Sequence, residues 1–323
     1  MLGFATDYAG ESASVEEMYR TLSDISEAGF SHIHWTHEWS GDYTYSVYEM
    51  IQIREWMDAL GLKSKGLHAT EGSNRRNIQG KYSYRWSEQD RRDYTSENDL
   101  NRLAGVELIK NRIDLAAVLG SSEIVLHMQL PYMQFEKSES FKEKYYSQVC
   151  KSFDEIEAYS KAKKVRVCLE NLLGTPNCFQ VEQFDLLFER YDSDFLGFCF
   201  DTGHGNITGD YPFELLERYL DRLFSVHLSD NHGLRSQDCW NVDSEMTKCD
   251  EHLIPFEGSL DWDRFAEIVA KSSYELPIVL EVSNKGRDNK SYLGACLEAG
   301  NRITESILSF RKTKKKESIW AIS

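Results

Sequence analysis

The stretch LGFCFDTGH, from Leu196 to His204, decides the fold. Over its first six residues the bulky L, F and F alternate with the small or polar G, C and D. Such alternation predicts a β-strand with one apolar face and one smaller face. The predicted strand closes on the acidic Asp201, and His204 follows shortly after it.

The same alternation occurs in three other stretches, VRVCLEN at 165–171, FSVHLS at 224–229 and IVLEVS at 278–283. In a barrel the bulky face of each strand, which includes Phe224, would meet the helices, and the other face would point into the lumen. Four polar side chains then converge from consecutive strands: Glu170, Asp201, His227 and Glu281.

Working outward, eight strand candidates alternate with eight amphipathic stretches. The strands are expected at 2–6, 32–36, 64–69, 123–128, 165–171, 196–201, 224–229 and 277–283. The helices are expected near 14–28, 44–60, 97–119, 139–163, 179–190, 210–220, 259–272 and 290–311. This order and this number are typical of a closed (β/α)8 barrel, the TIM barrel. We expect a single barrel over residues 1–312 and a basic C-terminal tail over 313–323.

Composition narrows the classes of function. The 323 residues include 53 acidic and 37 basic ones, for a net charge of −16, and 41% are hydrophobic. The hydrophobic content excludes a disordered chain, and the negative charge argues against a nucleic-acid partner. Seven cysteines without a CxxC pair indicate neither a disulfide framework nor a thiolate zinc site. Without a signal-peptide pattern or an apolar stretch of about 18 residues, we expect a cytoplasmic protein with no membrane partner.

Polar residues close nearly every predicted strand, and active sites of such barrels lie at these C-terminal ends. The residues concerned are His34, Glu38, His68, His127, Glu170, Asp201, His204, His227, Asp230 and Glu281. Three carboxylates and one imidazole from the last four strands form a mixed oxygen and nitrogen set that suits a divalent ion. Without a cation the carboxylates would repel one another. Two long loops, 70–97 and 231–258, are expected to act as lids or binding loops.

The stretches VCLEN, LGFCFDTGH, VHLSDNHG, DEHLIPFEGSLDW and IVLEVS together resemble the xylose-isomerase-like TIM barrels. This family includes sugar epimerases and isomerases, inosose dehydratase-like enzymes and endonuclease IV. The resemblance implies one divalent ion, with Mn favoured, held by Glu170, Asp201, His227 and Glu281. It also implies that Glu170 and Glu281 move protons. We expect His127 to assist catalysis, and the expected substrate-binding residues are His34, Trp35, His68, His204, Asp250 and His252.

The function expected from this resemblance is removal of a proton next to a carbonyl of a carbohydrate, followed by isomerisation or epimerisation. A small carbohydrate or glycoside is then the partner, and a homo-oligomer is expected, as in many relatives. One departure concerns the Arg that epimerases often carry six positions after the metal His. This chain has Gly233 there and Arg235 two positions further on, which argues against a standard ketohexose-binding mode.

Two alternatives remain. The stretches GFATDYAG, HIHWTHEW and LHATEG resemble the barrel subunit of C-glycoside deglycosidases, which eliminate an aglycone from 3-oxo-sugar conjugates. That resemblance implies a smaller partner subunit and a role near the mouth for Trp35, Trp39, Trp86 and Tyr132. Endonuclease IV holds three zinc ions with nine ligands, and its candidates here are His68, His127, Glu170, Asp201, His204, His227, Asp250, His252 and Glu281. The net charge, DTGH in place of DTCH, and HMQLPY after the fourth strand argue against that zinc phosphodiesterase.

Overall fold

The structure is a computed structural model. It describes residues 1–10, 14–39, 43–69, 75–78, 81–84, 92–128, 130–233 and 246–320. Much of each predicted long loop lies outside the described residues, including Trp86 and Arg235.

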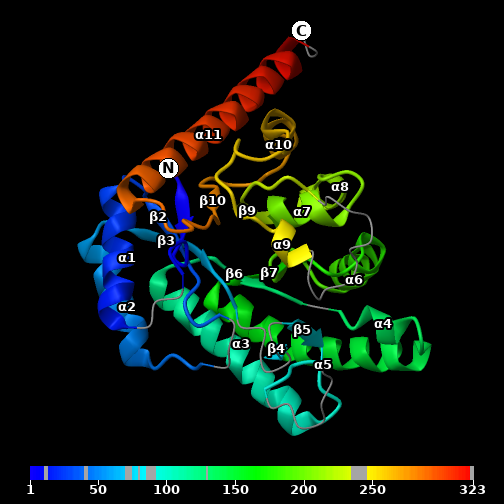
Figure 1. Cartoon of the computed structure of the whole chain (residues 1–323). Helices are drawn as coiled ribbons and strands as arrows, with labels where there is room; N and C mark the ends of the chain where they lie inside the picture. The colour runs from blue at the N-terminus through cyan, green and yellow to red at the C-terminus, as the bar shows by residue number, and fades with distance from the viewer. Residues whose placement is uncertain are drawn as a thin grey trace.

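Eight parallel strands form one sheet in the order β3-β2-β1-β10-β9-β8-β7-β6 (Figure 1). Their bounds are β1 Gly3–Ala5, β2 His32–Trp35, β3 Lys63–Leu67, β6 Glu123–Leu126, β7 Arg166–Glu170, β8 Leu196–Asp201, β9 Leu223–Leu228 and β10 Val279–Leu280. A parallel bridge between His68 and Val125 joins the two ends of the sheet. The Ala69 N–H donates to the Val125 carbonyl at 2.6 Å. The expected (β/α)8 barrel is therefore confirmed, and each of its eight predicted strands is present.

Helices surround the strands (Figure 1). Their bounds are α1 Val15–Glu27, α2 Val47–Ala59, α3 Asp99–Leu119, α4 Tyr132–Phe135, α5 Glu139–Lys163, α6 Asn177–Arg190, α7 Thr202–Thr208, α8 Glu214–Arg218, α9 Met246–Cys249, α10 Trp262–Val269 and α11 Asn289–Trp320. Ser14 and Ser46 begin α1 and α2 with capping boxes, which satisfy the first free N–H groups of each helix. No helix within the described ranges combines the length and apolarity needed to cross a membrane.

Three features differ from the predicted pattern. The helix α11 continues to Trp320, past the predicted end at 311, and Figure 1 shows its C-terminal part projecting beyond the barrel. An antiparallel hairpin of β4 (Arg75–Ile78) and β5 (Lys81–Tyr84) lies within the first long loop. The helix α7 begins directly after β8, where alternation gave no helical signal.

The prediction for Phe224 is wrong. The pairing of β8 with β9 shifts register between Phe198 and Cys199, so Phe224 lies between the residues that pair. It packs in the lumen against a small cluster that contains Cys168 and Cys199. Gly197 provides the space, because a Cβ there would lie 2.5 Å from the Phe224 ring. A β-bulge therefore turns this side chain inward.

Below the strand ends that carry the predicted site residues, side chains pack inside the barrel. Lys65 Nζ lies 3.0 Å from Glu123 Oε2 and donates to the Phe224 carbonyl at 3.2 Å. Both charged side chains are buried. A paired charge and an aromatic ring thus occupy the interior below the C-terminal ends of the strands.

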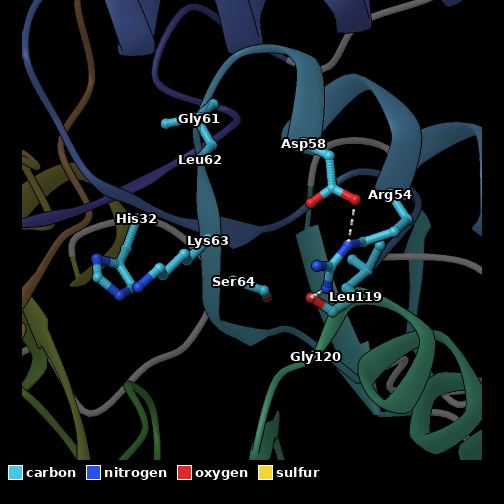
Figure 2. Close-up of a pocket in the computed structure, with 9 residues that line it drawn as sticks. All are labelled: His32, Arg54, Asp58, Gly61, Leu62, Lys63, Ser64, Leu119 and Gly120. Atoms are coloured by element: carbon cyan, nitrogen blue, oxygen red, sulfur yellow. Dashed lines mark hydrogen bonds and ion pairs between the residues drawn. The ribbon is translucent and has the colours of Figure 1, made fainter.

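A pocket of about 480 Å³ lies at the other end of the barrel, where His32 and Lys63 begin β2 and β3. Figure 2 shows that its Arg54 side chain is already engaged, because it contacts Asp58 at 2.9 Å and donates to the Leu119 carbonyl at 3.0 Å. These contacts hold together the C-terminal ends of α2 and α3. In TIM barrels this face serves stability rather than chemistry.

Candidate metal and proton-transfer site

Three of the four predicted metal ligands meet at the C-terminal ends of their strands. Glu170 ends β7, His227 lies in β9, and Glu281 follows β10. His227 Nδ1 lies 2.9 Å from Glu281 Oε2 and 3.3 Å from Glu170 Oε2. It makes no aligned hydrogen bond with either carboxylate, although all three groups are close. Three donor atoms therefore face one point without binding one another, which is the arrangement that a cation would occupy.

Asp201, the fourth predicted ligand, ends β8 and is fully buried. Its Oδ1 accepts from the His204 N–H at 2.7 Å and so caps α7. The Asn171 side chain holds the backbone of Asp201. Its Nδ2 donates to the Asp201 carbonyl at 2.9 Å, and its Oδ1 accepts from the Asp201 N–H at 2.8 Å. Asp201 Oδ2 has no hydrogen-bond partner among the described residues. Asp201 Oδ1 thus caps the N-terminus of α7, and Asp201 Oδ2 remains available to a ligand.

Two of the three overlapping groups of possible metal ligands among the described residues share Glu170, and the third joins His34, His68 and His227. One group joins Glu170 and Asp201 with His204, and another joins Glu170, His227 and Glu281 with His68. Glu170 thus links Asp201 to His227 and Glu281, although no single group within the described residues contains all four predicted ligands. His68 lies among the donor atoms of the group that contains Glu281, although it was expected to bind substrate.

A row of histidines leads from β2 to Glu170. His34 Nε2 lies 3.0 Å from His68 Nδ1, His68 Nε2 lies 3.2 Å from His127 Nε2, and His127 Nε2 lies 2.9 Å from Glu170 Oε2. His34 is fully buried, and burial holds the pKa of its imidazole well below the usual range. His34 therefore contacts His68 as a neutral imidazole. His127 is the most exposed of the three rings, at 8%, whereas His68 is 3% exposed. Substrate binding by His34 remains a prediction.

The structure also corrects the expectation for Trp35. Its side chain is 1% exposed, belongs to the main apolar core and donates from Nε1 to Tyr45 Oη at 2.9 Å. Strand alternation turns Trp35 outward, because it follows the lumen-facing His34. Among the described residues, Trp39 is an aromatic side chain at the site, and its ring centroid lies 5.3 Å from that of His68 and 5.0 Å from that of His127.

On the other side of the site, Asp250 lies between two histidines. Its Oδ2 is 2.9 Å from His252 Nε2 and 3.8 Å from His204 Nε2. His252 Nδ1 in turn contacts the Glu281 carbonyl oxygen at 2.9 Å. The long loop after β9 thus brings two of the predicted substrate-binding residues to the site.

The electrostatics of the site reflect burial of several like charges. Burial, together with Glu170, Glu281 and Asp250, raises the pKa of Asp201 to about 7. Burial also disfavours ionised Glu170, but His227 and His127 outweigh it and lower the pKa of that carboxyl. Likewise, His227 and His68 outweigh burial and lower the pKa of Glu281. A cation would relieve the repulsion that Asp201 experiences.

Residues 22–312 match the sequence profile of the xylose isomerase-like TIM barrel family. The chain belongs to this family. It is 32% identical over 267 residues to the protein y4fM of Sinorhizobium fredii, covering 82% of this chain and 81% of that protein. An inosose dehydratase of Clostridium botulinum is 26% identical over 188 residues, which span 54% of this chain and 61% of that enzyme. The solved structure of an L-ribulose 3-epimerase superposes with a TM-score of 0.68 at 15% identity, covering 98% and 97% of the two chains.

Sequence analysis of this xylose isomerase-like barrel did not single out Asp7. It follows β1 and interacts electrostatically with Glu281, His68 and His252. Burial and the charge of Glu281 raise the pKa of its carboxyl. The pattern that identified the other site residues, a polar side chain at the end of a predicted strand, also applies to Asp7. It is the first ionisable residue after the first predicted strand.

Proposed function

We propose that this xylose isomerase-like barrel is a divalent-metal-dependent enzyme that removes a proton next to a carbonyl of a carbohydrate and returns it, giving isomerisation or epimerisation. The observation that carries this proposal is that Glu170 and Glu281 both lie close to His227, at 3.3 and 2.9 Å from its Nδ1. The names of the inosose dehydratase and the L-ribulose 3-epimerase support a sugar-modifying enzyme.

The residues fit a divalent ion held by Glu170, Asp201, His227 and Glu281. Glu170 Oε1 and Asp201 Oδ2 are buried without a hydrogen-bond partner among the described residues. Buried polar atoms are normally satisfied, so these unpaired carboxylate oxygens are suited to bind a cation. Carboxylate oxygens and a single imidazole suit Mn, Mg, Fe, Co or Zn. The family resemblance favours Mn among them.

A bound divalent ion would polarise a substrate carbonyl and make the adjacent C–H bond more acidic. In this proposal one of the carboxylates Glu170 and Glu281 accepts that proton, and the other carries the proton that is returned. Return to the opposite face of the same carbon gives epimerisation, and return to the neighbouring carbon gives isomerisation. His127 orients Glu170 through their 2.9 Å contact. His68, His204, Asp250 and His252 would contact the sugar hydroxyls.

The test is uptake of solvent deuterium into a sugar. Protein loaded with Mn²⁺ is incubated in D₂O with ketopentoses, ketohexoses and inososes, and each sugar is then examined by NMR. We expect exchange at a carbon next to the carbonyl, and general acid–base catalysis predicts a loss of about 10²- to 10⁴-fold in Glu281→Gln. The matched control is Glu257→Gln, which removes an exposed carboxylate paired with Arg287. Full exchange in Glu281→Gln would contradict the proposed role.

A second candidate, a zinc phosphodiesterase, is favoured by one observation. All nine candidate ligands come together, with His68 and His127 beside Glu170 and with His204 and His252 beside Asp250. Metal analysis of the purified protein separates the two. About one ion per chain supports the sugar enzyme, whereas about three zinc ions and cleavage of duplex DNA at an abasic site would favour the phosphodiesterase.

Elimination from a 3-oxo-C-glycoside begins with the same proton removal. It is therefore distinguished by its product. Release of a free aglycone from such a conjugate, which in this reading needs a smaller partner subunit, would assign the barrel to the deglycosidases.

A further inference from the structure

The turn after β2 holds a residue in an unfavourable backbone conformation. Glu38 has a φ of 57°, in the left-handed region that side chains other than glycine rarely adopt. Its side chain is exposed, and the next residue is Trp39, which contacts the rings of His68 and His127. A conformation of this kind persists only where its surroundings impose it, and it often marks a functional site.

Arg112, on α3, binds the carbonyl of this residue. Its Nη2 donates to the Glu38 carbonyl at 2.7 Å, and its guanidinium lies 4.7 Å from the centre of the Tyr45 ring. The side chain is only 1% exposed, and its Nε has no partner among the described residues. The preceding carbonyl, that of His37, is bound by the Tyr45 hydroxyl at 2.8 Å. Two successive carbonyls are therefore held immediately before Trp39.

Among the described residues, no ion pair accounts for the buried cation at this position. Within the described residues Arg112 forms no ion pair, whereas Arg102 on the same helix pairs with Asp99 and Glu155. Burying an unpaired charge is costly, and an apolar residue of similar size is often as stable or more so. What the guanidinium provides here is a strong, directed hydrogen bond to the carbonyl of a strained residue.

We infer that Arg112 is a positioning residue that fixes the Trp39 indole as the aromatic wall of the sugar site. An indole face packs against the C–H face of a sugar ring, and Trp39 is half-buried beside His68 and His127. The ligand is therefore a sugar, or a glycoside, that presents one apolar ring face. The ligand part of this inference rests on the proposed function, and the positioning part does not.

The first experiment measures access of acrylamide to Trp39. Quenching of tryptophan fluorescence is compared between each protein and the same protein carrying Trp39→Phe, so that the difference reports Trp39. We expect Arg112→Met to raise this quenching toward that of an exposed indole, and Arg112→Lys, which keeps a donor for the Glu38 carbonyl, to restore part of the protection. The matched control is Arg102→Met, which removes a buried arginine from the same helix and leaves Trp39 protected. Unchanged Trp39 quenching in a folded Arg112→Met protein would overturn the inference.

A second variant guards against loss of folding. Glu38→Gly removes the backbone strain without removing Arg112, since glycine adopts the left-handed region at no steric cost. We expect this protein to unfold at no lower urea concentration than the wild type and to keep Trp39 protected from acrylamide, because Arg112 still donates to the carbonyl of residue 38. Exposure of Trp39 in Glu38→Gly, with Arg112 intact, would contradict the positioning role of Arg112.

The second experiment separates the sugar wall from the proposed reaction. For each sugar that shows deuterium exchange, Trp39→Ala and Arg112→Met should raise KM by about three- to tenfold, with kcat little changed. An unchanged KM in Trp39→Ala would contradict the proposal that the Trp39 indole packs against the sugar. If the wild type exchanges no sugar with any divalent metal, the proposed function fails and the sugar wall fails with it. The quenching result then decides the positioning role of Arg112 alone.

Discussion

His127 Nε2 lies 2.9 Å from Glu170 Oε2, and both side chains are buried at the mouth of the barrel. This contact orients a carboxylate that the proposed mechanism uses both to bind the metal and to move a proton. Partners of this kind are worth about 10- to 100-fold in metal affinity or activity.

The first prediction therefore concerns His127→Phe, which keeps a ring and removes the nitrogen. We expect Mn²⁺ affinity or the rate of sugar exchange to fall by about 10- to 100-fold, measured by calorimetric titration and by NMR. The control is His232→Phe, because His232 is an exposed histidine paired with Glu251. Equal loss in both variants would mean that the effect does not arise from the Glu170 contact.

The second prediction separates the two roles of Asp201. Asparagine caps helices about as well as aspartate, so Asp201→Asn should keep α7 and leave the free energy of unfolding nearly unchanged. Loss of the anionic ligand should lower Mn²⁺ affinity by more than about a hundredfold. Asp201→Ala should lose the metal equally and also about 1 kcal/mol of stability. Urea denaturation of the metal-free proteins measures the difference between the two variants, and identical stabilities would contradict the cap.

The third prediction concerns the ion pair inside the barrel. Lys65 Nζ and Glu123 Oε2 are 3.0 Å apart, with side chains 11% and 2% exposed. Removing one partner leaves the other charge buried without a partner. Lys65→Met and Glu123→Leu should therefore each lower the free energy of unfolding by about 3–5 kcal/mol. The double variant should recover most of that loss, because no buried charge then remains. A double-mutant cycle by urea denaturation measures the coupling, and purely additive losses would show that the pair does not act as a unit.

The fourth prediction is a pH dependence of stability. Burial lowers the pKa of His37 from 6.5 to about 4, and neither ring nitrogen has a hydrogen-bond partner among the described residues. The unfolded chain therefore binds a proton at a higher pH than the folded protein does. The contribution of His37 is complete above about pH 6.5 and is lost as the pH falls toward 4, by up to about 3 kcal/mol.

The measurement for His37 is urea denaturation between pH 7.5 and 4.5 in the presence of a chelator. His37→Phe should show a shallower loss of stability across this range than the wild type, because its ring cannot bind a proton. His232→Phe should keep the wild-type slope, since His232 is exposed. A wild-type slope in His37→Phe would assign the acid sensitivity to other groups.

Much of the site could be predicted because strands and strand ends follow a local rule. Alternation located all eight strands, and the polar residues that end them, such as Glu170 and Asp201, lie together in the structure. Parallel strands in a closed barrel bring their C-terminal ends to one face. The position of a residue at the end of a predicted strand is therefore enough to predict that these side chains lie together.

That rule fails wherever the backbone leaves the ideal strand. Phe224 faces the lumen because of a bulge, and a bulge changes the register without changing the residue pattern. Trp35, by contrast, obeys the alternation, which turns it into the core although it was expected to bind substrate; among the described residues, Trp39 is an aromatic side chain beside His68.

The sequence by itself determined the order of strands and helices, the family and the residues that gather at the mouth, because each depends on periodicity and on short motifs. Only the tertiary structure decided which of those residues face one another and how the loops present them. The carbonyl of Glu38 is bound by Arg112, which is 74 residues away in the chain and shares no local pattern with it. Contacts across such distances form only when the barrel closes, so no window of sequence contains them.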